Sequence, residues 1–102
     1  MNRLQQLMVI TMEECGELIQ ECSKTIRKHE TLADVGQKHR QTLLEEAGDV
    51  YAMIQIMIQS GIFTYYDLEL RAKEKHNKLK QWSNLFDETE KPDPKQQDMF
   101  DL

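Results

Sequence analysis

Two short acidic motifs lie about thirty residues apart, and both are set where a helical core should form. Residues 13–17 read E-E-C-G-E and residues 45–49 read E-E-A-G-D. In each motif two carboxylates stand three residues apart, so they lie on one face of a helix. Apolar residues recur around both motifs with helical spacing. Carboxylates in such stripes are costly to bury unless a positive charge neutralises them, and a hard divalent cation is the simplest neutraliser because it prefers oxygen ligands.

The periodicity of the apolar residues predicts an all-α fold with three helices. The helices are expected at about residues 2–28, 39–60 and 66–82. Gly61 should end the second helix, and Thr64 or Asp67 should cap the third. The polar connection 29–38 has room for a short helical turn. Gly16 and Gly48, inside the acidic motifs, are expected to let the first two helices approach closely.

Residues 50–58 are apolar on nearly all sides of the second helix, which predicts burial on several sides. A chain of 102 residues has only a small core of its own. We therefore expect an antiparallel helical hairpin plus a third helix, completed into a four-helix-bundle-type core by oligomerisation. The apolar half of the second helix should hold a homodimer, or a tetramer, together.

The character of the sequence changes after residue 84, which predicts a domain over residues 1–84 and a disordered acidic tail over residues 85–102. The tail contains two prolines and has no apolar periodicity. Its end is similar to the Q-x-D-[LM]-F peptides with which bacterial replication proteins dock on the sliding clamp. Gln96, Met99 and Phe100 are the candidate contacts. The alternatives are that the tail folds back on the domain or has no function.

Composition limits the class of partner. The net charge of −5 and the pI near 5.1 argue against direct binding of a nucleic-acid backbone. The most apolar stretch is too short to cross a bilayer, and the N-terminus does not look like a signal peptide. Cys15 and Cys22, two helical turns apart, are too distant for a disulfide and are expected to be core residues in a reducing compartment. The expected location is cytoplasmic.

Histidine and tryptophan side chains, which can bind metals or stack on bases, give weaker functional signals in this sequence. His29, His39 and His76 show no metal-ligand spacing and are expected on the surface. Trp82, at the end of the third helix, is expected to be a packing residue, and the alternative is a stacking platform.

An antiparallel hairpin brings the two acidic motifs to face each other. The four candidate metal ligands are Glu14, Glu17, Glu46 and Asp49. Four converging carboxylates repel one another when empty and bind Mg²⁺, or Mn²⁺, when filled. Mg²⁺ usually takes one or two protein carboxylates and completes its shell with phosphate oxygens. The pattern therefore indicates a phosphorylated substrate, and the alternative is an ordinary solvated acidic face.

The ordered pair of motifs, E-E-x-x-E followed by E-x-x-D in an E-E-x-G-D-V context, resembles the MazG-like all-α nucleoside triphosphate pyrophosphatases. The resemblance covers roughly residues 4–82. It implies that the four carboxylates bind Mg²⁺ and that Glu13 is a candidate base or a residue that orients the ligands. It also implies hydrolysis between the α- and β-phosphates of a nucleoside triphosphate, in dimers or tetramers of helical hairpins.

A K-x-x-x-N string on the third helix extends the resemblance. Lys73 and Asn77, with Lys80 one turn further, are candidate contacts to phosphate and nucleoside. The alternative is a lysine-rich helix that is simply solvated. Two other functions stay open for the whole chain: a helical interaction module without catalysis, and a pyrophosphohydrolase acting on a phosphoribosyl-ATP type of nucleotide.

Overall fold

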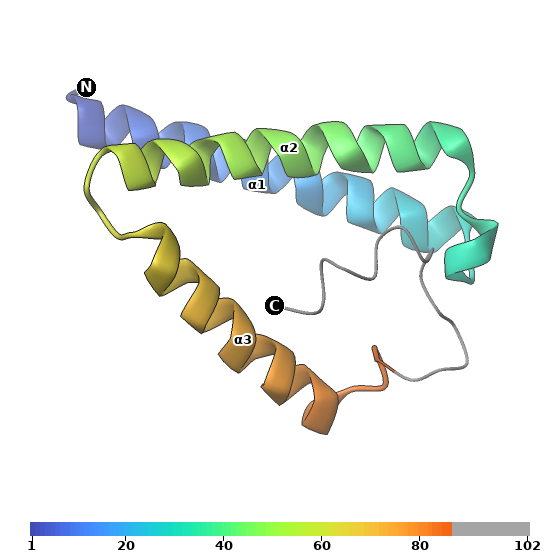
Figure 1. Cartoon of the computed structure of the whole chain (residues 1–102). Coiled ribbons are helices and arrows are strands. Elements are labelled where there is room, and N and C mark those ends of the chain that lie inside the picture. Colours follow the sequence, from blue (N-terminus) through green and yellow to red (C-terminus); the bar gives the residue numbers. More distant parts are fainter. Residues whose placement is uncertain (87–102) are drawn as a thin grey trace. The chain divides into compact units, whose positions relative to one another are not determined.

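The computed structural model describes residues 1–86 and is helical, which confirms the all-α prediction. The elements are α1 (Arg3–Lys28), the 3₁₀-helix η1 (Leu32–Asp34), α2 (Gln37–Gln59) and α3 (Tyr65–Trp82) (Figure 1). No strand occurs within residues 1–86. The chain divides after Ile62 into two compact units, the first holding α1, η1 and α2 and the second holding α3.

Helices α1 and α2 run side by side in opposite directions and form the predicted hairpin (Figure 1). Helix α1 begins with a capping box in which the Gln5 backbone N–H donates to Asn2 Oδ1 at 2.8 Å. At the open end of the hairpin, Arg3 Nη2 donates to Ser60 Oγ at 3.1 Å. This bond pairs the start of α1 with the residue that ends α2.

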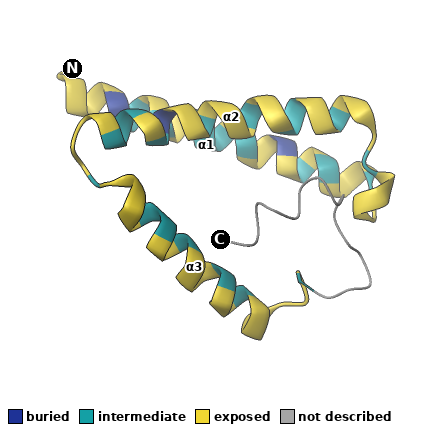
Figure 2. Cartoon of the chain, in the orientation of Figure 1, coloured by how far each residue is buried: buried dark blue, intermediate teal, exposed yellow. Residues whose placement is uncertain are grey.

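One strip of each helix is buried or half-buried, and its members follow one another at alternating steps of four and three residues (Figure 2). We call these the inner strips; they are Leu7, Thr11, Glu14, Leu18, Glu21 and Thr25 on α1, and His39, Leu43, Glu46, Val50, Met53 and Met57 on α2. Such spacing is that of core positions in a pair of packed helices. Acidic side chains therefore occupy core positions on both helices.

The apolar core of the hairpin is thin. Leu7 and Met53 are the only buried apolar side chains in residues 1–86, at 6% and 8% exposed. Residues 50–58 are mostly half-buried, and Tyr51 is exposed, so a single hairpin does not cover this segment on several sides as predicted. Cys22 is exposed too, against the prediction of a core position, and both cysteines are free thiols.

The predicted role of the two motif glycines is wrong within this hairpin. A Cβ atom built on Gly16 or Gly48 would meet no other atom within 4 Å. Neither glycine therefore lies at a close approach between α1 and α2.

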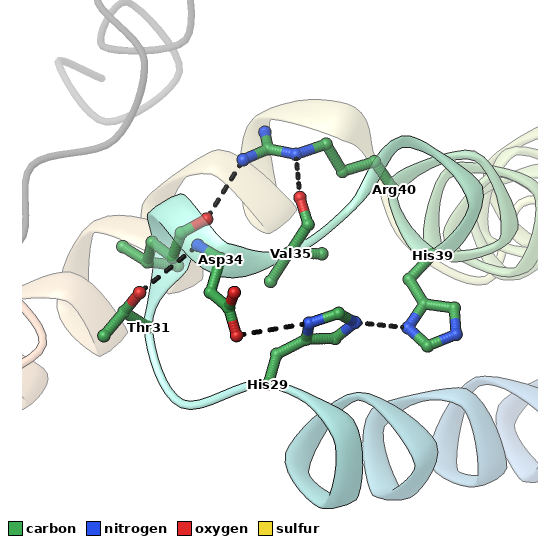
Figure 3. Close-up of polar contacts among 7 residues, drawn as sticks. His29, Thr31, Asp34, Val35, His39 and Arg40 are labelled. Atoms are coloured by element: carbon green, nitrogen blue, oxygen red, sulfur yellow. Dashed lines mark hydrogen bonds and ion pairs between the residues drawn. The ribbon is translucent and has the colours of Figure 1, made fainter.

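The connection between α1 and α2 contains the predicted short helical turn, as η1 (Figure 3). Thr31 caps it by accepting the Asp34 backbone N–H at 3.2 Å. Arg40 donates to the carbonyl oxygens of Val35 and Leu32 at 2.7 and 3.0 Å. The prediction that His29 and His39 are unrelated surface residues is wrong, because both rings are half-buried and in contact with each other.

Helix α2 ends in a Schellman motif. Gly61 adopts a φ of +80°, and the Ile62 N–H donates to the Met57 carbonyl at 3.1 Å. A positive φ favours glycine, which explains why α2 ends where the sequence predicts.

Helix α3 starts with a second capping box. Of the two predicted caps, Thr64 is the N-cap, and Asp67 is its partner three residues on. The hydrogen bonds from Thr64 hold the pKa of the Asp67 carboxyl below its ordinary value. Trp82, at the end of this helix, is 83% exposed. Its expected packing stays a prediction.

None of the helices within residues 1–86 combines the length and apolar character that a membrane crossing needs. From residue 87 onward the predicted tail, with Gln96, Met99 and Phe100, lies outside the described residues. The domain boundary at residue 84 stays a prediction.

Candidate metal centre

Four carboxylates of the hairpin meet between its two helices. Each offers one oxygen, and these oxygens all lie within 4.8 Å of one another. We call this set the acidic cluster; its members are Glu14 and Glu17 of α1 and Glu46 and Asp49 of α2. The antiparallel direction explains the arrangement, because a later residue of α1 lies beside an earlier residue of α2. The structure therefore brings together the four residues that the two motifs predict as ligands.

The cluster has a buried side and an exposed side. Glu14 and Glu46 belong to the inner strips and are half-buried, whereas Glu17 and Asp49 are exposed. The Oε2 atoms of Glu14 and Glu46 are both buried, and neither has a hydrogen-bond partner among the described residues. Buried polar atoms are normally satisfied, so two unsatisfied oxygens in one cluster fit a site that a cation or a hydrogen-bond donor could complete.

Burial and mutual repulsion shift the protonation of this pair. Burial raises the pKa of Glu14 above its ordinary value, and the nearby Glu17 and Asp49 carboxylates raise it further. Burial also raises the pKa of Glu46, with the proximity of the Glu17 carboxyl group as the second cause. Both shifts show that negative charge is disfavoured at this point of the fold. A bound cation would oppose both causes.

The chemistry of the donors indicates which class of ion the cluster would suit. All four donors are carboxylate oxygens, which suit hard cations such as Mg²⁺ and Mn²⁺ better than ions that prefer nitrogen or sulfur. Because Glu17 and Asp49 are exposed, the cluster is open to solvent on their side. Water or the oxygens of a second ligand can complete the coordination shell there.

Other residues of interest lie outside the cluster. Glu13 is exposed on α1 and is not among the four mutually close carboxylates. Glu21 is a residue that the sequence analysis missed: it is 5% exposed and occupies an inner-strip position. Its seven-residue spacing from Glu14 was the available signal, since residues two turns apart share a helix face.

The predicted substrate contacts lie on α3. Lys73, Asn77 and Lys80 are exposed, and their steps of four and three residues place them along one face of that helix. Their contact with a triphosphate stays a prediction.

Comparison with protein-family models, with curated proteins and with solved structures finds no match to this chain. The resemblance to the MazG-like enzymes therefore rests on the two motifs, and the functional argument rests on the acidic cluster itself.

The raised pKa values predict that stability falls as pH rises in the metal-free protein. The ordinary pKa of Glu14 and Glu46 is 4.5, and the folded values are higher. Between the ordinary and the folded values, the folded state binds more protons than the unfolded state. The contribution of these groups to stability should therefore be complete below pH 4.5 and decline above it. Asp67, whose pKa is lowered, changes stability only below its ordinary 3.8.

Urea unfolding with EDTA from pH 4.5 to pH 7 measures this effect. The matched variant is Glu14→Gln with Glu46→Gln, which removes both groups. The stability of the wild type relative to this variant should fall as pH rises, and excess Mg²⁺ should reverse the trend. A relative stability that rises with pH would contradict the described electrostatics.

Proposed function

We propose that this chain is a Mg²⁺-dependent nucleoside triphosphate pyrophosphohydrolase that releases pyrophosphate and a nucleoside monophosphate. One observation carries the proposal: four carboxylate oxygens from two helices lie within 4.8 Å of one another, and two of the residues have a buried, unsatisfied Oε2. Mn²⁺ is the alternative ion. The order and spacing of the motifs, which resemble those of the MazG-like enzymes, support the choice of reaction.

The residues of the hairpin have distinct proposed roles. Glu14 and Glu46 hold the buried side of the ion, fixed by their places on the inner strips, and Glu17 and Asp49 hold the open side. When bound, the ion would neutralise the cluster, polarise a phosphoryl oxygen and lower the pKa of a bound water. Glu13, exposed and next to the cluster in sequence, is the proposed proton acceptor or a residue that orients the ligands.

The proposed phosphate and nucleoside contacts are Lys73, Asn77 and Lys80. Lysine ammonium groups bind phosphate through charge-assisted hydrogen bonds, and an exposed helix face leaves these groups accessible. A chain with a net charge of −5 needs such local positive charge to receive an anionic substrate.

A second copy of the chain is the proposed cover for the exposed apolar surface. Next to the inner strips run two outer strips with the same steps of three and four residues, and their members are exposed or half-buried. They are Met8, Met12, Cys15, Ile19, Cys22 and Ile26 on α1, and Leu44, Ala47, Tyr51, Ile54 and Ile58 on α2. Strips with this period pack against other helices. Two hairpins joined along them would form a four-helix bundle, as the sequence predicts.

The competing proposal is a helical interaction module without catalysis, which the exposed outer strips also favour. The acidic cluster favours the enzyme, because a module needs no convergence of carboxylates. A substrate of the phosphoribosyl-ATP type would keep the same site and change only the nucleotide.

Removing one ligand charge should abolish hydrolysis and leave the fold intact. We expect Glu17→Gln and Asp49→Asn each to lower pyrophosphate release by more than about 100-fold, since even residues that only orient metal ligands contribute 10–100-fold. The assay is a panel of standard and modified nucleoside triphosphates with Mg²⁺. Without metal, both variants should melt at or above the wild-type temperature, because like-charge repulsion is relieved.

Glu45→Gln is the matched control, since Glu45 belongs to the same motif, is exposed and lies outside the cluster. It should retain activity. Near-normal hydrolysis by both ligand variants would overturn the assignment of the site.

Neutralising a phosphate contact should weaken catalysis, whereas removing the tail should not. We expect Lys73→Ala to raise KM or lower kcat by about 10- to 100-fold, the equivalent of about 1.5–3 kcal/mol for a charge-assisted hydrogen bond. Lys75→Ala, on another face of α3, is the matched control. A truncation after Phe86 should leave both constants nearly unchanged. If the truncation abolished activity while Lys73→Ala left both constants unchanged, the tail and not Lys73 would be part of the active site.

The outer strips predict a dimer in solution. Light scattering at micromolar concentration should give twice the 12.1 kDa of one chain. Ile19→Glu should yield monomers, because a buried unpaired charge opposes association. Gln20→Glu, an exposed neighbour off the strip, should stay dimeric. A monomeric wild type would contradict the proposed bundle.

A further inference from the structure

Two imidazole rings meet at the closed end of the hairpin (Figure 3). Nε2 of His29 lies 2.7 Å from Nδ1 of His39, and the ring planes are nearly perpendicular, at 82°. The other ring nitrogen of His29, Nδ1, lies 3.5 Å from Asp34 Oδ2. Carboxylate, imidazole and imidazole therefore form a chain across the connection between α1 and α2.

The contacts from Asp34 to His29 and from His29 to His39 favour one arrangement of protons on the two rings. A carboxylate beside Nδ1 of His29 favours the tautomer that carries its proton on that atom. Nε2 of His29 is then an acceptor, and Nδ1 of His39 donates to it. A single proton thus lies between two ring nitrogens. When His39 takes its other tautomer, with the proton on Nε2, Nδ1 of His39 and Nε2 of His29 both present lone pairs on the facing sides of the two rings. Two such neutral nitrogens are what a metal ion needs from a pair of histidine ligands.

The backbone around both rings is fixed before any ion binds. The His29 N–H caps α1 by donating to the Thr25 carbonyl at 3.0 Å. Asp34 is held by its bond to Thr31. Arg40, next to His39, bonds two carbonyl groups of the connection. Little conformational freedom is left to lose when an ion binds, which favours affinity.

We propose that His29 and His39 form a two-histidine site for a transition-metal ion of the Zn²⁺ class, with Asp34 orienting the His29 ring. Neutral imidazole suits Zn²⁺, Ni²⁺ and Cu²⁺, whereas Mg²⁺ prefers oxygen. Zn–N bonds of about 2.0–2.1 Å in tetrahedral geometry put two ring nitrogens roughly 3.3 Å apart. From their 2.7 Å contact, the two nitrogens would have to move apart by roughly 0.6 Å to reach that separation. Water completes the shell.

This site is separate from the acidic cluster and does not depend on the proposed function. His39 precedes Glu46 by seven residues on α2, or about 10 Å along the helix axis. The two sites also differ in donor chemistry. An ion held by both histidines would tie the end of α1 to the start of α2 and stabilise the hairpin at its closed end.

A Zn²⁺ titration of the full chain, followed by the NMR signals of the histidine rings, tests the site. The chain has three histidines, so His76 on α3 is an internal control. We expect the signals of His29 and His39 to change together with one midpoint, and His76 to change only at much higher Zn²⁺. Mg²⁺ should leave all three unchanged. Reading the rings separates this site from zinc bound by thiols or carboxylates.

Matched variants test cooperation between the two rings. His29→Gln should raise the midpoint for His39 at least about tenfold, and Asp34→Asn should raise it by a similar factor, the range expected when a residue that orients a metal ligand is lost. His76→Gln should leave the midpoint unchanged. Glu17→Gln, which tests the proposed enzyme, should also leave it unchanged, so the two proposals can fail separately.

Three outcomes would overturn the site. One is an unchanged His39 midpoint in His29→Gln. Another is an equal response of all three histidines. The third is that no histidine ring signal of the wild type changes below millimolar Zn²⁺. This outcome needs no variant.

Discussion

The packing of α1 against α2 is the interaction on which the rest of the structure depends. It places acidic side chains at positions that would otherwise hold a hydrophobic core, and the antiparallel direction makes two motifs from distant parts of the chain face each other. Buried like charges oppose the very packing that brings them together. Either protonation or a bound cation would relieve this repulsion, and above the pKa values of these groups only a cation can, which is the physical basis for proposing a cation site.

The thin apolar core also leaves the hairpin short of stabilising contacts on its outer surface. With Leu7 and Met53 the only buried apolar side chains within residues 1–86, the hairpin has little apolar burial to offset the carboxylates. Its outer strips leave large apolar side chains in solvent, including Ile19 and Tyr51. The proposed cation between the helices would offset the repulsion of the carboxylates. A second copy along the outer strips would cover the exposed apolar side chains. In this account, metal binding, oligomerisation and stability are linked.

Sequence reasoning succeeded where a property depends on periodicity. Helix ranges follow from apolar spacing, and the meeting of the two acidic motifs follows from the i, i+3 positions together with an antiparallel hairpin. The end of α2 at Gly61 follows from the conformational freedom of glycine, because that residue has a positive φ.

Most of the failures concern properties that no periodicity encodes. The contact of His29 with His39 depends on the path of η1 and its caps, which is a matter of loop geometry. The expected close approach at Gly16 failed because the side of a helix that meets its neighbour is set by the packed pair. The burial of Glu21 could have been found, since its spacing from Glu14 is that of the inner strip.

The most direct test of the central claim is a titration with Mn²⁺ followed by electron paramagnetic resonance, in which the six-line signal of the free ion disappears on binding. The account predicts that the wild type removes this signal, that Mg²⁺ restores it by competition, and that Glu45→Gln behaves like the wild type. Glu17→Gln and Asp49→Asn should leave most of the free-ion signal in place. Equal binding by all four proteins, or no binding by the wild type, would contradict the claim that these four carboxylates form a metal site.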